Sequence, residues 1–157
     1  MGSMQMKEAT GQPGPQSGTD SRRAEDLKKT ALYALVIDDQ EGICRLVATV
    51  LADLGVESAA YVTAKPAIAS LDQRWPDVIF LDVALDQSDA IDVIKGLAEK
   101  RYTGIVQLMS GGRLPLLEAM QRIGERYGLA VCPALQKPFA GEDIRRAIAE
   151  MGLPGLA

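Results

Sequence analysis

The 157-residue chain contains no histidine. This absence excludes a histidine-based catalytic triad, a histidine-ligated metal and a phosphohistidine within the chain. The two cysteines, Cys44 and Cys132, do not form a CxxC pair, so we expect buried free thiols and no metal or redox site. No apolar stretch is long enough to span a membrane, and the N-terminal region has no apolar segment typical of a secretory signal. These absences favour a cytoplasmic protein.

Aromatic residues are also scarce, at 4% of the chain, whereas 47% of the residues are hydrophobic. A core must therefore be built mainly from Val, Ile, Leu and Ala, and the length suits one domain. The formal net charge is -4. This charge argues against non-specific binding to nucleic acid, which requires a basic surface.

The composition changes along the chain and predicts three parts. Residues 1–29 are rich in Gly, Pro, Ser, Gln and charge, and their first three residues are typical of a cloning remnant. We expect a disordered tail there, in which Ser21–Lys29 could form a short polar helix. Residues 30–151 are expected to form the domain, and residues 152–157 a C-terminal tail.

Within the domain, short apolar runs alternate with longer amphipathic segments. The apolar runs predict strands at Leu32–Ile37, Val56–Tyr61, Val78–Leu81, Gly104–Met109 and Leu129–Leu135. The amphipathic spacing predicts helices at Glu41–Leu54, from a Thr63 cap to about Gln73, from a Ser88 or Asp89 cap to Glu99, at Leu114–Tyr127 and at Gly141–Met151. Apolar strands separated by helices indicate an α/β fold, a doubly wound five-stranded parallel sheet with five helices.

Polar residues follow four of the five predicted strands. They are the pair Asp38 and Asp39, then Asp82, Ser110 and Lys137. Because the carboxyl ends of parallel strands form the binding edge of such sheets, we expect these side chains to converge in one crevice.

The chemistry of this set is coherent. Clustered carboxylates repel one another and attract a hard divalent cation such as Mg²⁺. Such a cation can offset charge on a phosphoryl group while one carboxylate acts as the nucleophile. A lysine and a serine hydroxyl can contact the remaining phosphoryl oxygens.

Each residue also has an ordinary structural interpretation. Asp38 and Asp39 could cap the following helix, Lys137 could be a solvated loop residue, and Ser110 before two glycines could be turn chemistry. Asp82 is harder to explain in this way, because a carboxylate directly after an apolar strand is costly without a partner.

Taken together and in this order, these motifs resemble the receiver domain of two-component response regulators. The matching segments are LVIDDQ, PDVIFLDVAL, VQLMSGG and KPF, and the resemblance covers about residues 30–151. It implies a flavodoxin-like fold with strand order 2-1-3-4-5.

The resemblance also implies a role for each site residue. Asp82 would be the phosphoacceptor, and Ser110 and Lys137 would bind the phosphoryl group. Asp39 would ligate Mg²⁺ directly, Asp38 through water, and the carbonyl of Ala84 would complete the shell together with Asp82. The Lys137–Pro138 peptide bond is expected to be cis.

By this resemblance the chain would be a signalling switch that accepts a phosphoryl group from a histidine kinase or phosphotransfer protein. It would catalyse its own phosphorylation and dephosphorylation but act primarily in signalling. The downstream target, or a second copy in a homodimer, would meet the predicted fourth helix, fifth strand and last helix. Neither nucleic acid nor a membrane is an expected partner.

Three positions depart from the family pattern. Asp86 stands where receivers usually have proline, and Ala90 where they usually have glycine. Ala134 replaces the aromatic residue that normally responds to phosphorylation, which leaves the output mechanism open. A pseudo-receiver that serves as a constitutive interaction module is therefore the alternative. A nucleotide-binding or other α/β enzyme is disfavoured, because the sequence has no GxxxxGK[ST], GxGxxG or GxSxG motif in the required place.

The segment from Gly111 to Phe139 is similar to receivers joined to EAL-type cyclic-di-GMP phosphodiesterase domains. The sequence ends shortly after Met151. We therefore expect either a stand-alone receiver or a piece from which an output domain has been removed.

Overall fold

The computed structural model describes residues 31–85, 87–112 and 114–156. The expected N-terminal tail with its short helix, Asp86 and Arg113 lie outside this part. In chain order the elements are β2 (Tyr33–Ile37), α2 (Glu41–Asp53), β3 (Glu57–Tyr61), α3 (Ala64–Ser70), β4 (Val78–Asp82), α4 (Gln87–Glu99), β5 (Ile105–Ser110), α5 (Leu114–Arg126), β6 (Ala130–Gln136) and α6 (Gly141–Glu150). The alternation of strands and helices predicted from the sequence is confirmed.

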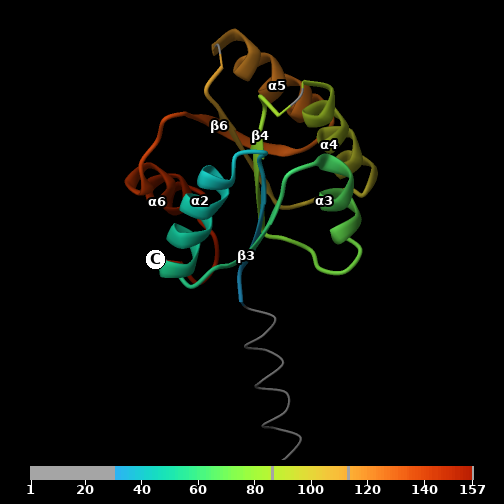
Figure 1. Cartoon of the computed structure of the whole chain (residues 1–157). Helices are drawn as coiled ribbons and strands as arrows, with labels where there is room; N and C mark the ends of the chain where they lie inside the picture. The colour runs from blue at the N-terminus through green and yellow to red at the C-terminus, as the bar shows by residue number, and fades with distance from the viewer. Residues whose placement is uncertain (1–30, 86, 113, 157) are drawn as a thin grey trace, which may run out of the picture. The chain divides into compact units, whose positions relative to one another are not determined.

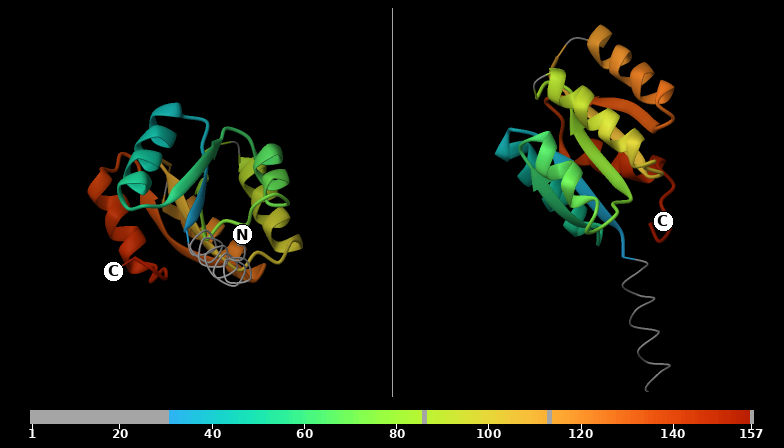
Figure 2. Two further views of the ribbon diagram at one scale, coloured as in Figure 1. Left: turned by 90° about the horizontal axis from the view of Figure 1, so that it is seen from below. Right: turned by 90° about the vertical axis from the view of Figure 1, so that its right-hand side faces the viewer.

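All five strands form one parallel sheet in the order β3-β2-β4-β5-β6. Numbered along the chain, this order is 2-1-3-4-5, as expected. Figure 1 shows the strands running through the centre of the domain, and Figure 2 shows helices on both sides of them. Strands β2 and β4 lie side by side in the middle, where the order reverses, so their carboxyl ends form the switch point at which such sheets bind ligands.

The sheet separates two hydrophobic cores. Alternate residues of β2 point to opposite faces, so Leu35 and Ile37 enter one core whereas Ala34 and Val36 enter the other. Helices α3, α4 and α5 cover the first core, and α2 and α6 cover the second. This double coverage explains why β2 and β4 are apolar throughout.

Helix α2 begins directly after the first acidic residues of the site. Its inward positions are spaced at helical intervals and include Cys44, Val47 and Leu51, all buried. The helix ends before Gly55, whose φ of +80° stops it in the left-handed region that glycine adopts without a steric penalty. None of the helices in the described residues combines the length and apolar character needed to cross a membrane.

The structure corrects several local expectations. Thr63 occupies the position before α3, but its side chain makes no capping hydrogen bond, and the helix ends at Ser70 instead of Gln73. Helix α4 begins at Gln87, so Ser88 and Asp89 lie inside its first turn and do not precede it. Cys44 is buried as expected, whereas Cys132 on the edge strand β6 is partly exposed.

Candidate functional site

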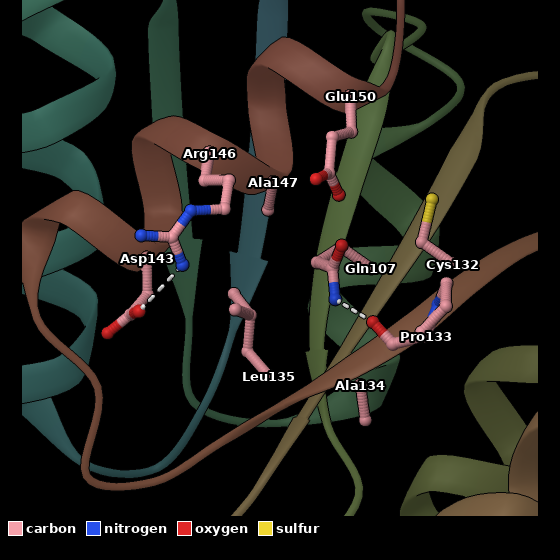
Figure 3. Close-up of a pocket in the computed structure, with 9 residues that line it drawn as sticks. All are labelled: Gln107, Cys132, Pro133, Ala134, Leu135, Asp143, Arg146, Ala147 and Glu150. Atoms are coloured by element: carbon pink, nitrogen blue, oxygen red, sulfur yellow. Dashed lines mark hydrogen bonds and ion pairs between the residues drawn. The ribbon is translucent and has the colours of Figure 1, made fainter.

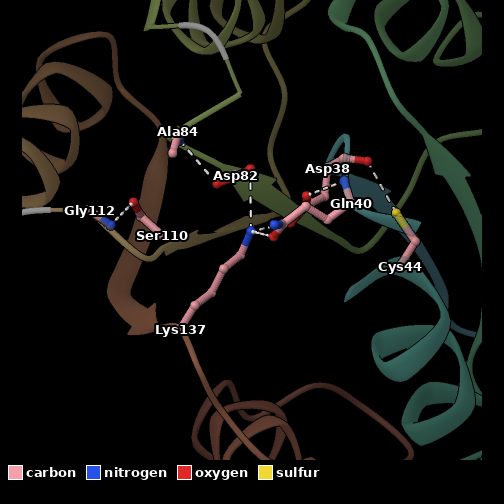
Figure 4. Close-up of polar contacts among 8 residues, drawn as sticks. All are labelled: Asp38, Gln40, Cys44, Asp82, Ala84, Ser110, Gly112 and Lys137. Carbon is pink, nitrogen blue, oxygen red and sulfur yellow. Dashed lines mark hydrogen bonds and ion pairs between the residues drawn. The ribbon is translucent and has the colours of Figure 1, made fainter. Parts of the chain in front are cut away.

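The carboxyl ends of the strands bring the predicted site residues together (Figure 4). Asp38 follows β2, Asp82 ends β4, Ser110 ends β5 and Lys137 follows β6. The sheet continues to this edge, because the Lys137 N–H donates to the Ser110 carbonyl at 2.9 Å. The convergence at this edge expected from the topology is therefore present in the structure.

A cleft of about 680 Å³ opens at this edge. Its lining includes Asp39, Gln40, Asp82, Ala84 and Lys137. Asp38 and Ser110 are fully buried beside this lining, which does not include them. The cleft therefore exposes Asp39 of the acidic pair, whereas Asp82 contributes to the lining although it is almost fully buried.

Three carboxylates form a cluster at the floor of the cleft. Ligand oxygens from Asp38, Asp39 and Asp82 all lie within 4.8 Å of one another. Oδ2 of Asp38 is buried without a hydrogen-bond partner in the described residues, although the Lys137 ammonium lies 2.8 Å away as an ion pair. Three carboxylates offer only oxygen ligands and a high negative charge, which are what a hard divalent cation prefers. One of them is exposed to solvent, and another has a buried oxygen without a hydrogen bond, so the cluster fits such a cation.

Burial raises the pKa of the Asp82 carboxyl above its ordinary value of 3.8. The backbone N–H of Ala84, which donates to its Oδ1 at 3.0 Å, lowers the pKa, the neighbouring Asp38 raises it, and Lys137 lowers it. The raised pKa means that the ionised form of the Asp82 carboxyl is disfavoured at this buried position. Positive charge brought into the cleft would therefore be stabilised there.

Lys137 supplies one such charge. Its ammonium lies 2.8 Å from Asp38 Oδ2 and 3.4 Å from Asp82 Oδ2, and its side chain is only 12% exposed. The Lys137–Pro138 peptide bond is cis, as expected. The lysine is therefore a largely buried counter-ion of the cluster and not a solvated loop residue.

Ser110 is held by the loop that follows it. Its Oγ accepts a hydrogen bond from the Gly112 N–H at 2.8 Å. The bond uses the hydroxyl oxygen as an acceptor, so the hydroxyl proton can still be donated to another group. This hydrogen bond is the local turn contact expected for a serine before two glycines, and it is compatible with a role of Ser110 in binding.

Two glutamines were not singled out by the sequence analysis. Gln40 accepts a hydrogen bond from the Lys137 ammonium at 2.9 Å, which only its place directly after the acidic pair could have suggested. Gln107 is 2% exposed in β5, and its amide donates to the Pro133 carbonyl at 2.8 Å.

Gln107 lies at an irregularity in the pairing of β5 with β6. It pairs with Cys132, whereas Met109 pairs with Leu135, so Pro133 and Ala134 oppose one residue. Ala134 packs against the core under α5. A groove of about 420 Å³ lies beside this bulge, between β6 and α6 (Figure 3). The bulge sets the register that brings Lys137 to the site.

The family follows from a match along most of this fold. The model of the response regulator receiver domain matches residues 34–149. The chain belongs to this family. A receiver domain acts in two-component signalling, where its partners are histidine kinases or phosphotransfer proteins.

Two curated proteins are similar to this receiver domain. Protein PilG of Pseudomonas aeruginosa is 27% identical over 128 residues, which cover 78% of this chain and 89% of PilG. Protein-glutamate methylesterase/protein-glutamine glutaminase 2 of Albidiferax ferrireducens is 34% identical over 74 residues, or 46% of this chain. The match covers only 21% of that methylesterase, so the likeness concerns its matched segment alone.

Solved structures have the same fold. A response regulator from Colwellia psychrerythraea superposes with a TM-score of 0.67 at 24% identity, covering 76% of this chain and 94% of that one. Chemotaxis protein CheY4 of Vibrio cholerae superposes with a TM-score of 0.66 at 21% identity, and the match covers 77% of this chain and 98% of CheY4. The resemblance to receivers joined to EAL-type domains stays a prediction.

Proposed function

We propose that Asp82 is the residue of this receiver domain that accepts the phosphoryl group. One observation carries the proposal: Asp82 ends the central strand β4 in the cleft, within 4.8 Å of two other carboxylates and 3.4 Å from the Lys137 ammonium. A nucleophilic carboxylate beside both an acidic cluster and a fixed cation suits transfer of a phosphoryl group to a carboxylate oxygen.

The residues of the chain would divide the work of transfer. A carboxylate oxygen of Asp82 forms the new bond to phosphorus, while the bond from phosphorus to the donor breaks and its electron pair leaves with the donor. Lys137 and the Ser110 hydroxyl stabilise the charge on the transferred oxygens. The Ala84 N–H keeps the other Asp82 oxygen in place, since it already donates to Oδ1 at 3.0 Å.

The acidic cluster supports Mg²⁺ as the cofactor. Asp38, Asp39 and Asp82 would hold it together with the carbonyl of Ala84, which lines the same cleft. The ion, when bound, supplies positive charge that offsets charge on the phosphoryl oxygens. The clustered carboxylates and the buried Oδ2 of Asp38 are the features that support this assignment.

The test is incubation of the protein with acetyl phosphate and Mg²⁺, followed by peptide mapping. We expect one phosphoryl group per chain, on the peptide that contains Asp82. A phosphoryl group found on a peptide lacking Asp82 would overturn the assignment.

The same proposal includes an output surface formed by α5, β6 and α6. Arg122 and Arg126 are exposed on α5, and Glu142, Arg145 and Arg146 lie on α6. Arg145 pairs with Asp53 at 3.2 Å and Arg146 with Asp143 at 3.4 Å, so part of this charge is engaged within the chain. A downstream target or a second copy would contact the remaining polar groups.

Phosphorylation would reach this surface through Ser110 and the loop after it. Ala134 has no side chain that could rotate inward, whereas Gly111 and Gly112 allow the loop backbone to rearrange at small steric cost. With beryllofluoride and Mg²⁺ standing in for the phosphoryl group, we expect NMR amide shifts at Ser110, Gly111, Gly112 and the first turns of α5. Smaller shifts are expected near Ala134. If the amide signals of α5 do not change while those of residues that touch the ligand do, this route to the surface is wrong.

A further inference from the structure

Gln40 connects the two sides of the cleft. Its backbone N–H donates to Oδ1 of Asp38 at 2.8 Å, and its side-chain Oε1 accepts from the Lys137 ammonium at 2.9 Å (Figure 4). The contact joins residues 97 positions apart in the sequence. Gln40 thus links the loop after β2 to the loop after β6.

Three oxygens surround the Lys137 ammonium. They are Asp38 Oδ2 at 2.8 Å, Gln40 Oε1 at 2.9 Å and Asp82 Oδ2 at 3.4 Å. The contact with Gln40 is a hydrogen bond, and the contacts with the two carboxylates are ion pairs. Two of the three belong to the acidic cluster, and Gln40 is the neutral one.

A cation in the acidic cluster would compete with this arrangement. The carboxylates of Asp38 and Asp82 are both partners of the lysine and members of the cluster whose ligand oxygens lie within 4.8 Å. A divalent cation at those oxygens repels an ammonium within a few ångströms, because burial weakens screening. Binding of the cation therefore requires Lys137 to give up its contact with Asp38. Gln40 carries no charge and is not a member of the cluster, so its Oε1 can still accept from Lys137 when a cation is bound to the carboxylates.

We propose that Gln40 is a positioning residue that retains Lys137 in the cleft when a divalent cation displaces the ammonium from Asp38. The inference rests on the proposed cation site. Without the cation, the lysine has two carboxylates and Gln40 contributes little. With the cation bound, Gln40 becomes the principal acceptor of the ammonium. The hydrogen bond is therefore worth more in the cation-bound state, and its loss weakens cation binding.

The test is a double-mutant cycle in which the affinity for Mg²⁺ is measured by calorimetry without a phosphodonor. Gln40→Met keeps the length of the side chain and removes the acceptor. In the wild-type background we expect this change to weaken Mg²⁺ binding about threefold to tenfold, the range for one ordinary hydrogen bond. In the Lys137→Met background, the same change leaves Mg²⁺ affinity as it is, because no ammonium needs to be retained.

A matched control and a spectroscopic readout separate positioning from a general structural effect. Gln73→Met alters an exposed glutamine in a turn after α3 and should change nothing. With Mg²⁺ bound, the chemical shifts of the Lys137 side chain should remain distinct from those of a solvated lysine in the wild type. In Gln40→Met they should move toward the values of a solvated lysine.

Two results distinguish failure of this proposal from failure of the cation site. Equal effects of Gln40→Met in both backgrounds, or no effect in either, would overturn the role of Gln40 while the cation site stands. Absence of Mg²⁺ binding by the wild type would overturn the cation site and this role together. Because no phosphodonor is used, neither result depends on whether Asp82 accepts a phosphoryl group.

Discussion

Asp82→Asn takes up no phosphoryl group from acetyl phosphate and Mg²⁺, whereas the wild type takes up one. The amide has nearly the shape of the carboxylate and can still accept the Ala84 N–H, but it lacks the anionic oxygen that attacks phosphorus. The expected loss is complete because the described site has no second carboxylate at the end of β4. Intact-mass measurement over a time course reads the uptake directly.

The same substitution should leave the fold at least as stable in Mg²⁺-free buffer. Asp82 is 2% exposed, and burial is the main cause of its raised pKa, so the charged form is disfavoured where it stands. Replacing it with a neutral amide removes this cost. A thermal melt of Asp82→Asn should therefore give a Tm no lower than that of the wild type.

Asp92→Asn is the matched control for both measurements, because Asp92 is exposed on α4. It should take up one phosphoryl group and melt as the wild type does. Uptake retained by Asp82→Asn would place the phosphoacceptor on another carboxylate. A much lower Tm in that variant would mean that the loss of uptake reports unfolding.

The sheet and its active edge could be predicted because they depend on patterns that the sequence carries directly. The run Val78–Leu81 is apolar throughout, which is the requirement for a strand covered on both faces, and β4 is buried along its whole length. Strands β3 and β6 are only half-buried, because they form the two edges of the sheet. Glu57 in β3 and Pro133 in β6 are local signs of an edge, but strand order decides which strands lie there.

Other features of the site depend on the geometry of side chains. The position of Lys137 follows from a bulge at Pro133 and Ala134, and the buried amide of Gln107 satisfies the Pro133 carbonyl there. A bulge adds one residue without changing the apolar pattern enough to reveal it. The contact of Gln40 with Lys137 likewise joins distant segments, so no local spacing predicts it.

Asp39→Ala should abolish the stabilisation that Mg²⁺ gives to the wild-type protein. Asp39 is the exposed member of the three-carboxylate cluster and lines the cleft, so it is the carboxylate that an incoming cation reaches from solvent. A ligand that binds only the folded state adds about 2.7 kcal/mol of stability at a hundredfold excess over its Kd. The wild-type Tm should therefore rise as Mg²⁺ is added, and the Tm of the variant should stay flat.

Removal of Asp39 should not itself destabilise the fold, so a difference in the response of Tm to Mg²⁺ between the variant and the wild type reports the loss of a ligand. Its carboxylate is exposed and close to two buried ones, so in Mg²⁺-free buffer its loss relieves repulsion at little cost in packing. Glu41→Ala, which removes an exposed carboxylate two residues further along, is the control and should keep the full response to Mg²⁺. If Asp39→Ala bound Mg²⁺ with unchanged affinity, the cation would be held without the exposed carboxylate and the proposed ligand set would be wrong. If Glu41→Ala lost the response equally, the effect would come from the overall negative charge near the cleft and not from a defined ligand.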